Sequence, residues 1–156
     1  MRCGIIVALP EELKTLSSRK LKQGEMLELT DDILVAYSGT GAANADKAAR
    51  QLIAKGAKRL MSWGCAAALV VDLKPGDLMM PGFVVVDGQW LATDSLWVQH
   101  AHQHISKHRL VHFENLAHSA DLVIQSEHKR SVHQQTLAVA LDMESGAIAK
   151  AARQHA

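Results

Sequence analysis

The sequence predicts an α/β protein, a three-layer α/β/α sandwich around a central mixed, largely parallel sheet. Apolar runs such as residues 3–8 are continuous, which is typical of strands buried on both faces. Helical patterns alternate with these runs, as in successive βαβ units. Turns rich in glycine, proline and aspartate separate the segments. The 156 residues show no internal repeat or linker, and they predict one domain over residues 1–156.

The first half of the chain is expected to begin with a buried strand and a short helix. That helix starts at Pro10, because proline suits the first helical turn. An Ala-rich helix over residues 42–55 follows the glycine turn 38–41 and ends at Gly56. The predicted strands of this half lie at residues 3–8, 25–29, 33–37 and 59–63, the second and third forming a hairpin.

The second half is expected to continue the alternation up to a final helix. A helix over residues 94–107 has Asp94 or Ser95 as its predicted N-cap. Further helices are predicted over residues 125–135 and from Met143 to about Arg153. The predicted strands lie at residues 78–80, 84–86, 110–113, near 122–124, and 137–141.

The composition excludes several classes of protein. Lys and Arg number 17 against 16 Asp and Glu, so no bulk electrostatic binding of nucleic acid is expected. No apolar segment reaches the roughly 20 residues of a membrane span. Cys3 and Cys65 lie in apolar runs and are predicted to be buried free thiols of a reducing compartment. The cytoplasm is therefore the expected location.

Glu144 lies where the last predicted strand meets the last helix. One interpretation is structural: Asp142 is the N-cap of that helix, and Glu144 complements its dipole. The other is functional, because a carboxylate at the carboxyl end of a sheet can accept hydrogen bonds from the vicinal hydroxyls of a ribose. The pattern leaves both interpretations open.

Glu12 follows the first strand in the same way. It is either a solvated glutamate in the first helical turn or a general base that positions water. The Ser38–Gly41 turn resembles an incomplete dinucleotide fingerprint, since Asn44 stands at the third glycine position. Its N–H groups can hold a hydroxyl, water or anion at a helix N-terminus, or the turn can simply require glycine.

Two other groups of residues are candidates for chemistry. Cys65 after Gly64 is either a thiol nucleophile or, as its small neighbours favour, an inert packed cysteine. His100 and His104 share a helix face and could bind a metal together, with His102 nearby. No cysteine or carboxylate completes the set, so we interpret them as surface histidines and expect no metal or cofactor.

Taken together, several segments resemble the purine nucleoside phosphorylase / methylthioadenosine–adenosylhomocysteine nucleosidase superfamily, in order and spacing across nearly the whole chain. Residues 142–149 resemble the family's Glu-Met-Glu signature, and residues 38–41 resemble its Ser-Gly-Ile-Gly turn. The segments are residues 4–12, 38–41, 63–69, 73–78 and 142–149.

This resemblance implies a nucleoside phosphorylase/hydrolase fold and an enzyme that cleaves an N-ribosyl bond. It implies that Glu144 binds the ribose hydroxyls, that Met143 packs against the sugar and that Glu12 activates a water. Leu122 and Val123 would line the purine pocket. The other substrate-binding residues it implies are Ser38, Gly39, Thr40, Gly64, Cys65 and Ala66.

Departures from the family pattern refine these expectations. Residues 8–12 replace the phosphate loop of the phosphorylases, which favours water as the acceptor. Leu122 or Val123 replaces the aromatic residue over the base, and Cys65 the family's serine. The short stretch between Met80 and His118 resembles the hopanoid-associated nucleosidase-like proteins, which implies a bulky apolar 5′ substituent.

The family's aspartate that protonates purine N7 lies on a strand beyond the final helix, and no residue here matches it. The chain is therefore expected to be truncated, or to receive that strand from elsewhere. We predict hydrolysis of a purine nucleoside, with adenine as the base and a modified 5′ group, by a homodimer. The alternatives are a phosphorylase and a catalytically weak nucleoside-binding domain.

Overall fold

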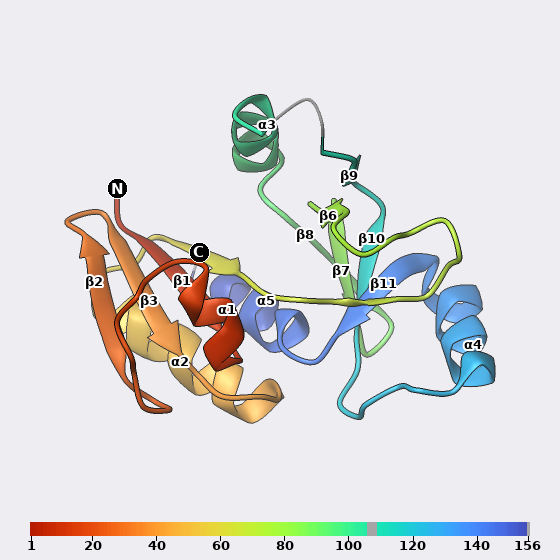
Figure 1. The fold of residues 1–156 in the computed structure, drawn as a ribbon, viewed down its shortest axis with the longest axis horizontal. Coiled ribbons are helices and arrows are strands. Elements are labelled where there is room, and N and C mark those ends of the chain that lie inside the picture. The colour runs from red at the N-terminus through yellow and green to blue at the C-terminus, as the bar shows by residue number, and fades with distance from the viewer. Residues whose placement is uncertain (106–108, 156) are drawn as a thin grey trace. The chain divides into compact units, whose positions relative to one another are not determined.

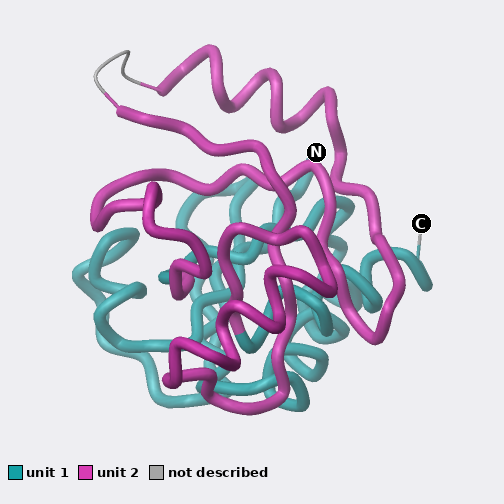
Figure 2. Tube along the Cα trace, turned by 90° about the vertical axis from the view of Figure 1, so that its right-hand side faces the viewer, with its two compact units in different colours: residues 1–65, 143–156 teal, residues 66–142 magenta. Residues whose placement is uncertain are grey.

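The structure is a computed structural model that describes residues 1–105 and 109–155. The chain divides into two compact units, residues 1–65 with 143–156 and residues 66–142 (Figure 2). We call them the first and the second unit and describe each by itself. The predicted end of the helix at residues 106–107 lies outside the described residues.

The first unit contains a four-stranded sheet in the order β2-β3-β1-β4 (Figure 1). Its central strand β1 pairs in parallel with both β3 and β4, and β2 pairs antiparallel with β3 as the predicted hairpin. The strands are β1 (Cys3–Val7), β2 (Met26–Thr30), β3 (Ile33–Tyr37) and β4 (Arg59–Ser62).

Helices cover both faces of this sheet. Helix α1 (Pro10–Lys14) begins at the predicted proline, and α2 (Ala42–Ala54) ends before Gly56, whose φ is 90°. Helix α5 (Ser145–Gln154) packs beside α2. Because side chains alternate along a strand, successive residues of β1 serve different cores. The first unit is thus itself an α/β/α sandwich.

Small residues build one of these cores and β-branched residues the other. Ile6 faces α2 and α5, where Ala45, Ala49 and Ala151 are fully buried and let the helices approach closely. On the opposite face, Ile5, Val7 and Val35 pack against Leu13 of α1. Leu13 is therefore the apolar side chain that anchors α1 to the sheet.

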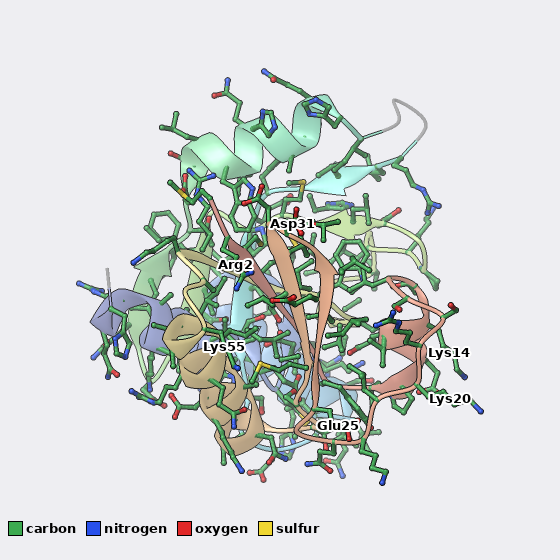
Figure 3. All side chains as sticks on the ribbon, turned by 90° about the vertical axis from the view of Figure 1, so that its left-hand side faces the viewer. Arg2, Lys14, Lys20, Glu25, Asp31 and Lys55 are labelled. Carbon is green, nitrogen blue, oxygen red and sulfur yellow. The ribbon has the colours of Figure 1, made fainter. Side chains whose placement is uncertain are left out.

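Arg2, just before β1, makes hydrogen bonds to three other segments of the first unit; Figure 3 labels Arg2, Asp31 and Lys55. Its Nε donates to the backbone carbonyl of Asp31 at 3.1 Å, and Nη1 donates to that of Lys55 at 3.3 Å. Nη2 pairs with Glu28 at 3.2 Å. One guanidinium thus joins β1, the β2–β3 hairpin and the C-terminus of α2, using the planar set of donors that arginine offers.

The second unit contains a five-stranded sheet in the order β5-β11-β10-β7-β8. Strand β10 runs parallel to β7 and β11, whereas β5 and β8 pair antiparallel with their neighbours. Two short strands, β6 and β9, pair in parallel. The strands are β5 (Ala67–Ala68), β6 (Leu78–Met79), β7 (Phe83–Val86), β8 (Gln89–Ala92), β9 (Val111–His112), β10 (Asn115–His118) and β11 (Ala138–Asp142).

Two helices belong to the second unit. Helix α3 (Ser95–Gln103) begins at Asp94, whose side chain accepts a hydrogen bond from the amide of Trp97 and so confirms the predicted N-cap. Helix α4 (Ser126–Thr136) packs on β10 and β11, above a core of Leu69, Ala117, Ala138 and Leu141. This core has fewer buried residues than the core between the sheet, α2 and α5 of the first unit.

The sequence analysis was wrong about a strand near residues 122–124. Leu122 and Ile124 are 71% and 72% exposed and belong to no strand. The strand is β10 instead, whose two buried residues, Leu116 and Ala117, are too few to form a conspicuous apolar run. Strand β8 was also missed.

The turn before β8 explains that hairpin. Asp87 and Gly88 both have positive φ, 49° and 72°, as a two-residue hairpin turn requires.

The predicted α/β class with mixed, largely parallel pairing is confirmed, whereas a single domain over residues 1–156 stays a prediction. Among the described residues, no helix is both long enough and apolar enough to cross a membrane.

Candidate functional site

The loops that follow three parallel strands carry the candidate site. Because β3 and β4 both run parallel to β1, their carboxyl ends lie at one edge of the first unit's sheet. The chain passes from β3 through α2 to β4 on the other side of β1, which creates a topological switch point. Ligands of open α/β sheets bind at such an edge.

Glu12 is buried at this edge, with 8% of its surface exposed. Its Oε2 accepts hydrogen bonds from the amides of Ala8 at 2.9 Å and Leu9 at 3.0 Å. Its Oε1 accepts a third from the amide of Cys65 at 2.9 Å. The interpretation of Glu12 as a solvated glutamate is therefore wrong, since backbone donors fix the carboxylate from both sides.

Gly64 is required by this arrangement. A Cβ added to it would lie 2.4 Å from Oε1 of Glu12, which no real side chain tolerates. The loop after β4 can therefore close over the carboxylate only when residue 64 is glycine. The glycine serves a close approach here rather than an unusual φ.

Glu144 is also held by backbone amides. The N–H of Gly41 donates to Oε1 at 2.6 Å, and that of Met143 donates to Oε2 at 3.3 Å. Gly41 is the N-cap residue of α2, with φ 93°, so the negative charge lies at the positive end of that helix dipole. The carboxylate stabilises the start of α2 and makes no cap for its own helix.

The predicted N-cap at Asp142 is wrong. Asp142 is the last residue of β11, and Glu144 itself occupies the N-cap position of α5. The helix starts two residues later than the sequence suggested because Met143 and Glu144 form the strand-to-helix junction. This offset directs the Glu144 side chain to the Gly41 amide.

The turn between β3 and α2 is internally bonded. The Ser38 hydroxyl is buried and lies 3.1 Å from the carbonyl of Val7 and 2.8 Å from that of Gly39. Asn44 donates from its amide to the carbonyl of Thr40 at 2.8 Å, which explains a side chain at the third glycine position. Thr40 itself is exposed, so its hydroxyl is the accessible polar group of the turn.

The cysteines differ from the prediction. Both are free, but Cys65 is exposed, because the chain leaves the sheet at Gly64. Its backbone rather than its thiol contributes to the site through the bond to Glu12. Cys3 is partly buried, and that burial raises the pKa of its thiol.

Three residues predicted to bind the substrate belong to the second unit. Ala66 and Leu122 are exposed, whereas Val123 packs partly buried against the core beneath α4. Met143 of the first unit is partly buried beside Glu144. The structure thus gathers Glu12, the glycine turn and the Gly64–Cys65 loop at one sheet edge.

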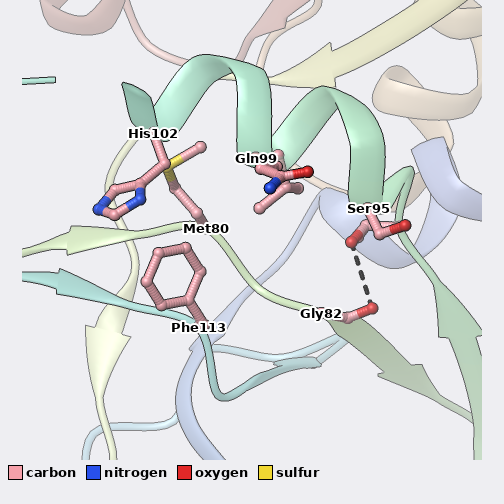
Figure 4. Close-up of a pocket in the computed structure, with 8 residues that line it drawn as sticks. Met80, Gly82, Ser95, Gln99, His102 and Phe113 are labelled. Atoms are coloured by element: carbon pink, nitrogen blue, oxygen red, sulfur yellow. Dashed lines mark hydrogen bonds between the residues drawn. The ribbon is translucent and has the colours of Figure 1, made fainter. Parts of the chain in front are cut away.

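The second unit also has a pocket that the sequence did not indicate (Figure 4). It measures about 280 Å³ and lies between α3 and the chain near β7 and β9. Met80 and Phe113 form its apolar floor, and the ring of His102 meets that of Phe113 edge-on, with centroids 5.0 Å apart. The hydroxyl of Thr93 lies within hydrogen-bond distance of the backbone carbonyls of Pro81, at 2.7 Å, and Gly82, at 3.2 Å.

Other histidines also make contacts. The rings of His100 and His104 have centroids 4.6 Å apart, and Nδ1 of His104 lies 2.8 Å from the carbonyl of His100. Within residues 1–105 and 109–155, no group of three or more possible metal ligands occurs. His112 lies 3.2 Å from Asp77, a pair that the sequence analysis did not identify.

The pKa of Asp77 is lowered, first by a hydrogen bond from the backbone N–H of Lys74 and then by His112.

A family model described as "Phosphorylase superfamily" matches residues 2–156. The chain belongs to the phosphorylase superfamily. A comparison with curated proteins finds no match. Solved structures resemble this superfamily member closely in fold. The nucleosidase for 5′-methylthioadenosine and S-adenosylhomocysteine from S. pneumoniae is 20% identical, with a TM-score of 0.86 over 99% of this chain and 80% of its own.

Two other similar structures come from different bacteria. The corresponding nucleosidase of Neisseria meningitidis is 22% identical, with a TM-score of 0.81 over 98% of this chain and 80% of its own. Futalosine hydrolase of Helicobacter pylori is 21% identical, with a TM-score of 0.81 over 98% of this chain and 78% of its own. At these identities the likeness shows a shared fold, and the predicted nucleoside phosphorylase/hydrolase fold is confirmed.

Proposed function

We propose that this phosphorylase-superfamily chain cleaves the N-ribosyl bond of a purine nucleoside with water. The observation that carries the proposal is the Glu12 carboxylate, which three backbone amides hold at the carboxyl edge of the sheet. A fixed carboxylate in that position can orient a water and accept its proton. The geometry needs no movement of Glu12 before reaction, which is the preorganisation that catalysis exploits.

The same contacts favour water over phosphate. The N–H groups of Ala8 and Leu9, beside the start of α1, already donate to Glu12. A phosphate approaching that loop would find these donors occupied and would meet a negative charge of its own sign. Water carries no charge and accepts the carboxylate as a hydrogen-bond partner.

Glu144 is the proposed ribose ligand. Each carboxylate oxygen can accept more than one hydrogen bond, and each receives one from the backbone amides of Gly41 and Met143. The remaining lone pairs can accept the two vicinal hydroxyls of a ribose. As the base departs, the sugar becomes cationic, and the two glutamates stabilise the charge that develops.

The proposed substrate is an adenine nucleoside with a modified 5′ group. Solved relatives support this class: a mutant of an H. pylori nucleosidase holds 5′-methylthioadenosine in its active site, and the S. pneumoniae nucleosidase binds a transition-state inhibitor. In this chain, Leu122 and Val123 are proposed to contact the base and Met143 the sugar. We further propose a homodimer located in the cytoplasm, working without a cofactor.

The test is base release from 5′-methylthioadenosine with and without phosphate, followed by chromatography of adenine. The proposal predicts adenine and a free 5-methylthioribose in phosphate-free buffer, with no increase on adding phosphate. Strict phosphate dependence with a ribose 1-phosphate product would instead establish a phosphorylase. Thermal stabilisation by the nucleoside without any adenine release would establish a binding domain.

A further inference from the structure

Trp63 follows β4 directly and precedes the Gly64–Cys65 loop. We propose that Trp63 is a positioning residue, which holds α1 so that the Glu12 carboxylate stays aligned for attack by water. This inference rests on the proposed hydrolytic function, and it concerns a residue that touches neither the reacting atoms nor the carboxylate. Its action passes through Thr15.

Two hydrogen bonds in series connect Trp63 with Glu12. The indole Nε1–H of Trp63 donates to Oγ1 of Thr15 at 2.8 Å. The Thr15 hydroxyl then donates to the backbone carbonyl of Glu12 at 2.7 Å. A hydroxyl accepts and donates at once, so the two bonds are compatible and run in one direction.

The same loop holds Glu12 at a second point. Two residues beyond Trp63, the amide of Cys65 donates to Oε1 of Glu12 at 2.9 Å. Trp63 and Cys65 therefore bind opposite ends of one residue, the first through the backbone carbonyl and the second through the carboxylate. The orientation of Glu12 is thus restrained at its backbone as well as at its carboxylate.

Helix α1 needs such an external support. It has five residues, far fewer than the roughly 12–15 at which an isolated helix becomes marginally stable in water. Only Glu12 and Leu13 of this helix are buried. Thr15 is its C-cap residue, so the bond from Trp63 acts at the end of α1 opposite the Leu9 amide, which donates to Glu12.

Loss of this support should affect the chemical step rather than substrate binding. A displacement of a catalytic group by about 1 Å can cost up to about a hundredfold in rate. The proposed ribose ligand Glu144 is held by the Gly41 amide, without Trp63. The expected signature is a lower kcat at an almost unchanged KM.

The experiment compares five variants with the wild-type chain. Trp63→Phe removes the bond to Thr15 and should lower kcat about three- to tenfold, the range of one net hydrogen bond. Thr15→Val removes this bond and the one to the Glu12 carbonyl, and should lower kcat at least as much. The double variant should lose no more than Thr15→Val alone, because that variant already breaks the whole connection. Thr15→Ser should recover much of the activity, and Trp90→Phe, an exposed tryptophan of the second unit, is the matched control.

Amide hydrogen exchange at Cys65 in the free protein provides a readout that needs no turnover. It should accelerate in Thr15→Val and Trp63→Phe but not in Trp90→Phe. Unchanged exchange, additive losses of kcat, or a rise in KM instead of a fall in kcat would each overturn the proposal. A wild-type chain that releases no base would contradict the proposed function, and the exchange data would still decide whether Trp63 fixes Glu12.

Discussion

The amide of Gly41 donates a 2.6 Å hydrogen bond to Oε1 of Glu144, a residue 103 positions later in the sequence. This bond joins the turn after β3 to the N-cap residue of the last helix, within the first unit. It explains why Glu144, at the N-cap position of α5, accepts no capping hydrogen bond from the first turn of that helix. The carboxylate serves another helix and keeps lone pairs for a ligand.

Glu144→Gln should weaken binding of an adenine nucleoside about 10- to 100-fold, since hydrogen bonds to a charged group contribute about 1.5–3 kcal/mol. The amide oxygen of glutamine can still accept from Gly41, so the fold should persist. Isothermal titration with 5′-methylthioadenosine measures the affinity, with Glu127→Gln on α4 as the matched control. Equal affinities for the two variants would leave Glu144 as a cap for α2 only.

Gly64→Ala should disturb Glu12 more than it disturbs the rest of the fold. The new Cβ would lie 2.4 Å from Oε1, so the loop or the carboxylate must move, at a cost of about 1–3 kcal/mol. Urea unfolding gives the stability, and amide exchange at Cys65 reports the loop. Gly82→Ala is the control, since its nearest neighbour is 3.6 Å away. Equal stability of the two variants would show that the loop relaxes freely.

Leu137→Gly should stabilise the protein. Leu137 is the C-cap residue of α4 in the left-handed region, with φ 54°, and its side chain is 61% exposed. A non-glycine residue pays about 1–2 kcal/mol in that conformation, partly offset by the greater chain entropy of glycine in the unfolded state. We expect a higher urea midpoint at an unchanged m-value. A lower midpoint would mean that the leucine side chain makes a stabilising contact.

Asp77→Asn should destabilise the protein near neutral pH and matter less in acid. The folded-state pKa of Asp77 is lowered, chiefly by the Lys74 amide, so its stabilisation is present above the unfolded-state pKa. That stabilisation is lost as the pH falls through the folded-state value. Thermal unfolding of wild type and variant at pH 7 and in the acid range measures the difference, with Asp31→Asn as control. A difference in Tm that stays constant with pH would contradict this.

Local signals predicted most of the first unit. Pro10, the glycine turn and Gly56 are short-range determinants, and the structure places α1 and α2 where they indicate. The burial of Glu12 could not be predicted in this way, because one of its donors, Cys65, lies 53 residues along the chain. Gly64 is consistent with a close approach at this position, but only the structure shows that the approaching atom is Oε1 of Glu12.

The second unit was harder to predict because its elements are short. Strands β5, β6 and β9 have two residues each, so no periodicity can develop in them. Strand β10 has only two apolar residues, so it is less conspicuous in the sequence than the more apolar Leu122–Ile124 segment, in which Leu122 and Ile124 are exposed. The offset of α5 from Asp142 to Glu144 likewise depends on where β11 ends rather than on capping preference.

The most direct test of the central claim compares Glu12→Gln with Glu11→Gln, its exposed neighbour on α1. The account predicts that wild type releases adenine in phosphate-free buffer and that Glu12→Gln lowers kcat by about 10²–10⁴, while nucleoside binding persists. Glu11→Gln should retain the wild-type rate. Equal rates for the two variants would contradict the role of Glu12 as the group that activates water.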